Sequence, residues 1–270
     1  MSGAAPRRYE RYVAIGDSST EGLNDPDGRG GFRGWSERLA ERIAAQQGGL
    51  LYANLAIRGR TTRRIRLEQL DRAAAMRPDL ATLFSGTNDV MARHFDAGAV
   101  GEDMRHMQRT LIDGGAVVLT FTLPDLTPVM PIARLFAPRI RALNDAMRRA
   151  AAASGATLLD FAAYPVATDL RLWSDDRIHA NAAGHARIAE ALSDALALPG
   201  SDHGWMQPLP LQPSPTRVER IGAELAWVGR HVLPWLVLSP ARRAEAAARR
   251  CKRPELAPLM PPTRGGRVAG

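Results

Sequence analysis

Three residues far apart in this chain have the side chains required for nucleophilic attack on an acyl group. Ser18 lies in a polar turn directly after the apolar run 12–15, and a serine hydroxyl becomes a nucleophile when a base accepts its proton. Asp176 precedes His179 by three residues, a spacing that lets the carboxylate hydrogen-bond one ring nitrogen and fix the tautomer. The other ring nitrogen can then accept the serine proton. The sequence therefore predicts a serine nucleophile with a histidine base.

Two further residues could bind the negative charge that develops on an attacked carbonyl oxygen. Gly59 follows the apolar run 51–57, and a glycine lets a backbone N–H approach a ligand closely. Asn88 follows the run 80–84, and its side-chain amide offers two N–H donors. These donors could stabilise the oxyanion of a tetrahedral intermediate.

Each of these features also has an ordinary structural interpretation when it is taken alone. Ser18 could lie in a plain strand-to-helix turn, Gly59 could be a loop glycine, and Asn88 could cap a helix or form an Asx-turn. The pair Asp176 and His179 could be a surface salt bridge. Together they favour catalysis, because they follow different strands or precede the last helix and supply a nucleophile, a base and oxyanion donors.

Neighbouring titratable residues have secondary or structural interpretations. Asp175 breaks the three-residue spacing to the histidine, so it ranks second as the orienting carboxylate. Asp17 and Asp89 are expected to brace their loops, because aspartate commonly stabilises turns. His185 is expected in the last helix, and no histidine or cysteine has a recognisable metal-ligand spacing. We therefore expect no metal and no cofactor.

Apolar runs alternate with helical patterns along most of the chain, which is typical of a parallel sheet covered by helices on both faces. The expected strands are 12–15, 51–57, 80–84, 116–122 and 157–161, and the expected helices are 35–47, 61–76, 98–112, 139–153 and 181–198. The predicted fold class is α/β, a three-layer α/β/α sandwich with a flavodoxin-like five-stranded parallel sheet. Ligands of such sheets bind at the carboxyl ends of the strands, where the candidate residues lie.

The C-terminal quarter of the chain differs in composition from the rest. A Pro-rich linker at 206–215 precedes an amphipathic helical pattern at 216–232, a basic stretch at 241–253 and a Pro/Gly-rich end at 254–270. We expect an α/β domain over residues 9–198, and a linker, a helical extension and a basic tail over 199–270, with 254–270 disordered. The helix could lie on an anionic membrane surface, but packing against the catalytic body is favoured, because soluble proteins avoid exposed tryptophans.

Composition excludes several classes of protein. With 270 residues, 45% of them apolar, the chain can bury a sizeable core, and a single cysteine, Cys251, excludes an intrachain disulfide. The net charge of +8 comes mostly from residues 201–270, which hold 11 basic and 5 acidic residues, so nucleic-acid binding is not indicated. No run of about 18 apolar residues could span a membrane, and the polar segment 1–11 is not followed by an apolar secretory region. A cytoplasmic protein is expected. No Gly-rich phosphate loop follows the first strand, which argues against a nucleotide-binding protein.

The motifs resemble those of the SGNH/GDSL hydrolase family over about residues 9–198. Gly16-Asp17-Ser18 resembles the first block of the family, Gly59 the second, Gly86-Thr87-Asn88-Asp89 the third, and Asp176 with His179 the last. The segment 54–60 is similar to an actinobacterial-type esterase branch. Ser19 stands where many relatives have a bulkier apolar residue, a difference that bears on the substrate rather than on catalysis.

The resemblance implies a serine esterase that forms an acyl-enzyme and needs no metal. Ser18, Asp176 and His179 would form the catalytic triad, and the amides of Ser18 and Gly59 with the Asn88 side chain would form the oxyanion hole. The expected partner is a small-molecule carboxylic ester with a small to medium acyl group. Lipase, thioesterase and carbohydrate acetylesterase activities stay open, as does a non-catalytic binding protein with the same fold.

Overall fold

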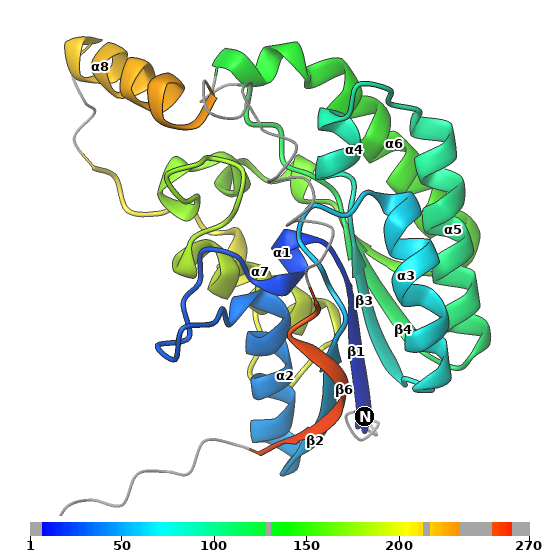
Figure 1. The fold of residues 1–270 in the computed structure, drawn as a ribbon. Coiled ribbons are helices and arrows are strands. Elements are labelled where there is room, and N and C mark those ends of the chain that lie inside the picture. Colours follow the sequence, from blue (N-terminus) through cyan, green and yellow to red (C-terminus); the bar gives the residue numbers. More distant parts are fainter. Residues whose placement is uncertain (1–6, 128–130, 213–216, 233–249, 261–270) are drawn as a thin grey trace, which may run out of the picture.

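A six-stranded sheet with the order β5-β4-β3-β1-β2-β6 forms the centre of the molecule (Figure 1). The computed structural model describes residues 7–127, 131–212, 217–232 and 250–260. Neighbouring strands from β1 to β5 are parallel, whereas β6 is antiparallel to β2. The strands are β1 (Arg11–Gly16), β2 (Leu50–Asn54), β3 (Leu80–Phe84), β4 (Val117–Phe121), β5 (Thr157–Leu159) and β6 (Arg253–Leu259).

The two central strands are almost entirely buried because helices cover both of their faces. All residues of β3 are buried, and in β1 only Arg11 is partly exposed. The last residues of these strands, Gly16 and Phe84, pair with each other. The segments that follow the two strands therefore leave the sheet side by side at its carboxyl edge.

Five long helices pack on the sheet at the places that the sequence predicts. Figure 1 shows α2 and α7 on one face and α3, α5 and α6 on the other. Large, fully buried side chains lie on both faces, among them Trp35 and Leu39 on one side and Met104 and Met107 on the other. The helices are α1 (Ser18–Glu21), α2 (Gly34–Gln47), α3 (Thr62–Ala75), α4 (Thr87–Met91), α5 (Ala97–Asp113), α6 (Ala137–Ser154), α7 (Ala182–Ala195) and α8 (Arg217–Trp227), with a π-helical turn at Val228–Val232. The predicted α/β sandwich is thus confirmed.

The sixth strand corrects the prediction of a five-stranded sheet and of a disordered segment from residue 254 onwards. Strand β6 pairs with the edge of β2, with Leu259 opposite Leu50 and Ala257 opposite Tyr52. Its two prolines are compatible with this position, because an edge strand donates hydrogen bonds on one side only. Leu256 and Leu259 pack against the core. This burial stabilises an ordered strand in a segment whose composition alone predicts disorder. Residues 261–270 lie outside the described part of the chain.

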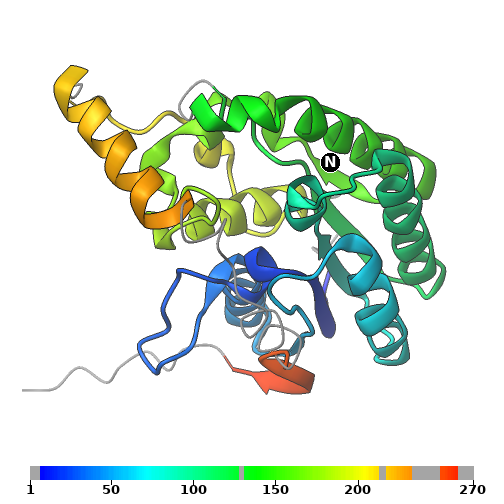
Figure 2. The same ribbon diagram turned by 45° about the horizontal axis from the view of Figure 1, so that its top comes forward.

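Helix α8 projects from the body of the protein and contacts it mainly through its C-terminal end (Figure 2). Trp227 is buried against Leu126 and Ala133, whereas Ile221 and Leu225 are exposed. The predicted helical extension is therefore present, and the favoured packing against the body holds for one end of it. No helix in the described segments has the length and apolar character needed to cross a membrane.

Candidate active site

The turn that carries Ser18 closes tightly between β1 and α1. A Cβ atom on Gly16 would lie 2.2 Å from Thr20 Oγ1 and 2.5 Å from the Phe84 carbonyl oxygen, so only glycine lets the chain turn here against β3. Asp17 caps α1 by accepting a hydrogen bond from the Ser19 amide at 3.1 Å. These local contacts hold Ser18 at the carboxyl edge of the sheet with its side chain largely buried.

Ser18, His179 and Asp176 form a continuous hydrogen-bonded chain. Ser18 Oγ lies 2.7 Å from His179 Nε2, and His179 Nδ1 lies 2.8 Å from Asp176 Oδ2. The loop that carries the histidine is closed by the Ser174 amide, which donates to the His179 carbonyl oxygen at 2.9 Å. The structure therefore brings these three predicted residues together. Asp175, the second-ranked carboxylate, is exposed to solvent.

Five donors surround the Asp176 carboxylate. Oδ1 accepts from the amides of Ile178 and His179 at 2.9 and 3.0 Å and from Ser174 Oγ at 2.7 Å. Oδ2 accepts from Asn24 Nδ2 at 3.1 Å in addition to the histidine ring. Although burial raises the pKa of Asp176, the hydrogen bond and charge of His179 outweigh it and hold the pKa well below its usual range. The carboxylate thus stays ionised and fixed in direction.

Asn88 lies between the turn of Ser18 and the loop of Gly59. Its Nδ2 donates to Asp17 Oδ2 at 3.2 Å and to the Arg60 carbonyl oxygen at 3.1 Å. Both N–H bonds of the amide are used in this structure, so an oxyanion would have to replace one of these long contacts. Gly59 itself is exposed and has a φ of +79°, a left-handed conformation that favours glycine.

Two buried aspartates brace the loops around the site, as the sequence predicts. Asp17 holds Asn88 and the start of α1, and burial raises its pKa to about 6 against the opposing hydrogen bond from Ser19. Asp89 accepts from both the amide and the hydroxyl of Thr62 at 2.9 Å, which ties α4 to the start of α3. Across the described ranges, no three His, Cys, Asp or Glu side chains are grouped so that they could hold a metal ion.

An apolar cavity of about 80 Å³ lies beside Ser18 and His179. Aromatic rings form much of its wall: Phe84 stacks on Phe121 with centroids 4.1 Å apart. Phe161 meets Phe121 edge-on at 5.2 Å, and Trp205 meets Phe161 at 5.8 Å. This row of aromatic rings therefore extends from Phe84 at the end of β3 to Trp205 in the segment after α7.

Two residues of the site carry no motif signal. Ser174 lies two positions before Asp176, where its hydroxyl reaches both the carboxylate and the His179 carbonyl oxygen. Asn24 lies in the Gly/Asp/Pro-rich loop after α1, about 150 residues away in sequence, and reaches the same carboxylate. No local spacing could have indicated the contact between Asn24 and Asp176, because only the folded loop brings them together.

His185 lies in α7, as the sequence predicts, and holds the loop after α1 against α2. Its Nε2 donates to the Leu23 carbonyl oxygen at 3.0 Å, and its Nδ1 accepts from the Trp35 amide at 3.2 Å. The side chain is completely buried. Both ring nitrogens are satisfied only in the neutral form, because a protonated ring would present a second N–H to the Trp35 amide.

We expect His185 to make the protein sensitive to acid. Burial lowers its pKa to about 4; the Leu23 carbonyl and Asp25 oppose this shift, and Arg38 and His179 add to it. The pKa of an unfolded histidine is about 6.5, so between about pH 6.5 and 4 the unfolded state binds the extra proton. Stability contributed by the neutral ring is therefore lost as the pH falls through this window, by about 2 kcal/mol between pH 6.5 and 5.

Urea unfolding of wild type and His185→Gln at about pH 7.5 and 5 measures this contribution. Glutamine can accept from the Trp35 amide and donate to the Leu23 carbonyl without titrating. The variant should therefore lose about 2 kcal/mol less stability on acidification than wild type does. Equal losses in the two proteins would show that the histidine is not the titrating group.

The fold and the site together define a class of protein. A mostly parallel sheet between two helical layers presents a serine, hydrogen-bonded to a histidine, at the carboxyl ends of its strands. The chain belongs to the GDSL-like lipase/acylhydrolase family, whose model matches residues 14–187. As a member of this family it is a serine ester hydrolase.

Several solved structures share this fold, and two of the three described here are named as esterases. TesA is 22% identical with a TM-score of 0.55, and the match covers 69% of this chain and 98% of TesA. The psychrotrophic esterase EstA from Pseudoalteromonas sp. is 16% identical with a TM-score of 0.56, covering 70% of this chain and 97% of EstA. The acetylxylan esterase Axe2 from Geobacillus stearothermophilus is 18% identical with a TM-score of 0.56, covering 73% of this chain and 96% of Axe2. No curated protein sequence matches the chain.

Proposed function

We propose that the chain hydrolyses small-molecule carboxylic esters through a Ser18–His179–Asp176 triad and an acyl-enzyme. The observation that supports this most directly is the unbroken hydrogen-bonded chain from Ser18 Oγ through both ring nitrogens of His179 to Asp176 Oδ2. This arrangement gives each group one role, which matches a serine nucleophile, a general base and an orienting carboxylate.

The proposed reaction has two steps that share one base. His179 Nε2 accepts the Ser18 proton as Oγ attacks the ester carbonyl carbon, and the same nitrogen then protonates the leaving alcohol. A water molecule attacks the acyl-enzyme in the second step, with His179 again accepting and returning the proton. Asp176 remains ionised throughout, because its pKa is held well below its usual range, and it stabilises the imidazolium.

The oxyanion would be bound by the amides of Ser18 and Gly59 and by the Asn88 side chain. Asn88 contacts Asp17, next to Ser18, and the Arg60 carbonyl, next to Gly59, so it lies between the other two proposed donors. We infer that one of its two long hydrogen bonds is exchanged for the oxyanion when the tetrahedral intermediate forms. Donors placed in this way stabilise charge that develops only in the transition state.

The apolar cavity beside Ser18 supports a small to medium acyl group as the group transferred. Phe84, Phe121 and Phe161 have no hydrogen-bonding groups for a charged or hydroxylated acyl group. An aliphatic acyl chain would instead bury its surface against these rings. Hydrolysis of p-nitrophenyl acetate, butyrate and octanoate, combined with labelling of Ser18 by a fluorophosphonate, tests the proposal. Folded protein that neither hydrolyses these esters nor binds the probe at Ser18 would contradict it.

A substitution in the cavity wall is expected to change the preference for acyl length. Ala167 is a small, partly exposed residue of the wall, so Ala167→Leu should occupy space that a longer acyl chain needs. Losing room for one or two methylene groups is worth about 10-fold or more in kcat/KM. We expect octanoate hydrolysis to fall by about 10-fold relative to acetate hydrolysis. Ala152→Leu, at an exposed position of α6, is the matched control and should leave the ratio of the two rates unchanged.

A further inference from the structure

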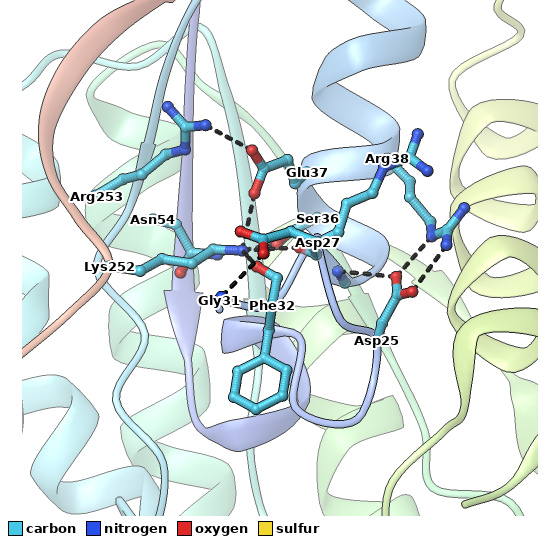
Figure 3. A network of polar contacts seen from close by, with 12 residues as sticks. Asp25, Asp27, Gly31, Phe32, Ser36, Glu37, Arg38, Asn54, Lys252 and Arg253 are labelled. Atoms are coloured by element: carbon cyan, nitrogen blue, oxygen red, sulfur yellow. Dashed lines mark hydrogen bonds and ion pairs between the residues drawn. The ribbon is translucent and has the colours of Figure 1, made fainter. Parts of the chain in front are cut away.

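Lys252 is the only lysine of the chain, and its ammonium group is fully engaged at the base of the loop after α1. Nζ donates to the carbonyl oxygens of Phe32 and Arg33 at 2.6 and 2.7 Å and to Glu37 Oε2 at 2.9 Å (Figure 3). An ammonium has three N–H donors, so all of them are used. The group therefore acts as a clamp between the C-terminal segment, the loop and the first turn of α2.

Strand β6 holds the clamp in place. Lys252 directly precedes β6, and Arg253 at the start of the strand forms an ion pair with Glu37, the same carboxylate that Lys252 contacts (Figure 3). A second contact also holds the start of β6: Arg72 of α3 donates to the Pro254 carbonyl oxygen at 3.0 Å. Burial lowers the pKa of Lys252, while the charge of Glu37 and the hydrogen bond to it oppose that shift.

The loop Gly22–Gly34 is a small hairpin whose two legs are joined by short contacts. Pro26 and Phe32 form an antiparallel bridge, and the Arg33 amide donates to the Asp25 carbonyl oxygen at 2.8 Å. The Asp25 carboxylate accepts from the Gly34 amide at 3.0 Å and from the Arg38 guanidinium at 2.7 and 2.8 Å. The leg that Lys252 holds is thus connected directly to the leg that contains Asn24.

Asn24 connects this loop to the proposed triad. Its Nδ2 donates to Asp176 Oδ2 at 3.1 Å and to Ser174 Oγ at 2.8 Å, so it holds the oxygen that also faces His179. Its φ is +70°, in the left-handed region that asparagine tolerates better than most residues. The contact therefore depends on the loop keeping an unusual backbone conformation at this residue.

The same loop reaches the other side of the site. The Arg58 guanidinium lies over the Phe32 ring, with Cζ 5.1 Å from the ring centroid. Arg58 also forms an ion pair with Glu21 at the end of α1. Arg58 directly precedes Gly59. The carbonyl oxygen that Lys252 binds and the ring that supports Arg58 belong to the same residue, Phe32.

We propose that Lys252 and Asn24 are positioning residues for ester hydrolysis: docking of β6 places Lys252 on the loop Gly22–Gly34, and the loop places Asn24 on Asp176. This inference rests on the proposed function of Ser18, His179 and Asp176. Neither residue touches the reacting atoms, and both act through the direction of the Asp176 carboxylate. Loss of an outer partner of a metal-binding side chain typically costs about 10- to 100-fold in activity, and we expect a loss near the lower end of that range for this carboxylate.

The experiment compares Lys252→Met, Asn24→Ala and the double variant in full-length protein. Methionine keeps an unbranched stem and removes the three donors. Each protein is titrated with a fluorophosphonate, and kcat and KM for p-nitrophenyl acetate are expressed per titrated site, so that any unfolded fraction drops out. Glu255→Gln, which removes a charge from an exposed position of β6, is the matched control and should behave as wild type.

We expect kcat per site to fall about 10-fold in Asn24→Ala and about 5-fold in Lys252→Met, with KM nearly unchanged. The double variant should lose about 10-fold, because both changes release the same carboxylate, whereas independent effects would multiply to about 50-fold. Wild-type kcat in both single variants, or a multiplied loss in the double variant, would overturn the inference while Ser18→Ala stays inactive. An active Ser18→Ala would overturn the proposed function and this inference together.

Discussion

Ser18→Ala is expected to lower kcat for p-nitrophenyl esters by roughly 10⁴- to 10⁶-fold, because the variant has no oxygen with which to form the acyl-enzyme. The serine hydroxyl is the group that lies 2.7 Å from His179 Nε2, so its removal also leaves the base without a proton to accept. Only binding and the proposed oxyanion donors would remain, and these support a small residual rate above that of water.

Steady-state hydrolysis and labelling by a fluorophosphonate measure the same loss in two ways. In wild type, intact-mass analysis should show one adduct that maps to Ser18, and in the variant no adduct should form. Ser201→Ala is the matched control, because its hydroxyl hydrogen-bonds to the Leu198 carbonyl beyond α7 and belongs to no proposed catalytic group. An unchanged rate in Ser18→Ala would remove this serine as the nucleophile.

Asp176→Asn is expected to lower kcat by about 10³- to 10⁴-fold while the protein remains folded. The asparagine has nearly the same shape, but it presents an amide N–H or a neutral oxygen to His179 Nδ1 in place of a carboxylate. The ring can then adopt the wrong tautomer, and the imidazolium formed during attack loses its stabilising charge. The loss should appear in kcat rather than in KM, because Asp176 does not contact the proposed acyl cavity.

Asp175→Asn is a sharp control for this result. It makes the same chemical change one residue earlier in the chain, at an exposed position, and should leave kcat within about two-fold of wild type, as surface substitutions usually do. The same pair of variants decides between the two candidate carboxylates that the sequence offers. A larger loss in Asp175→Asn would assign the orienting role to the neighbouring residue.

The local pattern of the chain was sufficient to predict the fold class and the residues that meet at the sheet edge. Strand-length apolar runs that alternate with helices allow few arrangements other than a parallel sheet with crossover helices. In that arrangement the segments after β1 and β3 leave the sheet at one edge, which places Ser18 near Asn88. The three-residue spacing of Asp176 and His179 is likewise a local property of one loop.

The partners of these groups were decided by tertiary structure. Strand β6 forms because β2 offers an open edge and the core accepts Leu256 and Leu259, and neither condition can be read from a Pro-rich segment. Asn24 reaches Asp176 only because the loop after α1 folds into a hairpin, and Lys252 binds that hairpin from more than 200 residues away. Sequence specifies chemistry and local conformation over a few residues, whereas contacts between distant loops depend on the packing of the whole chain.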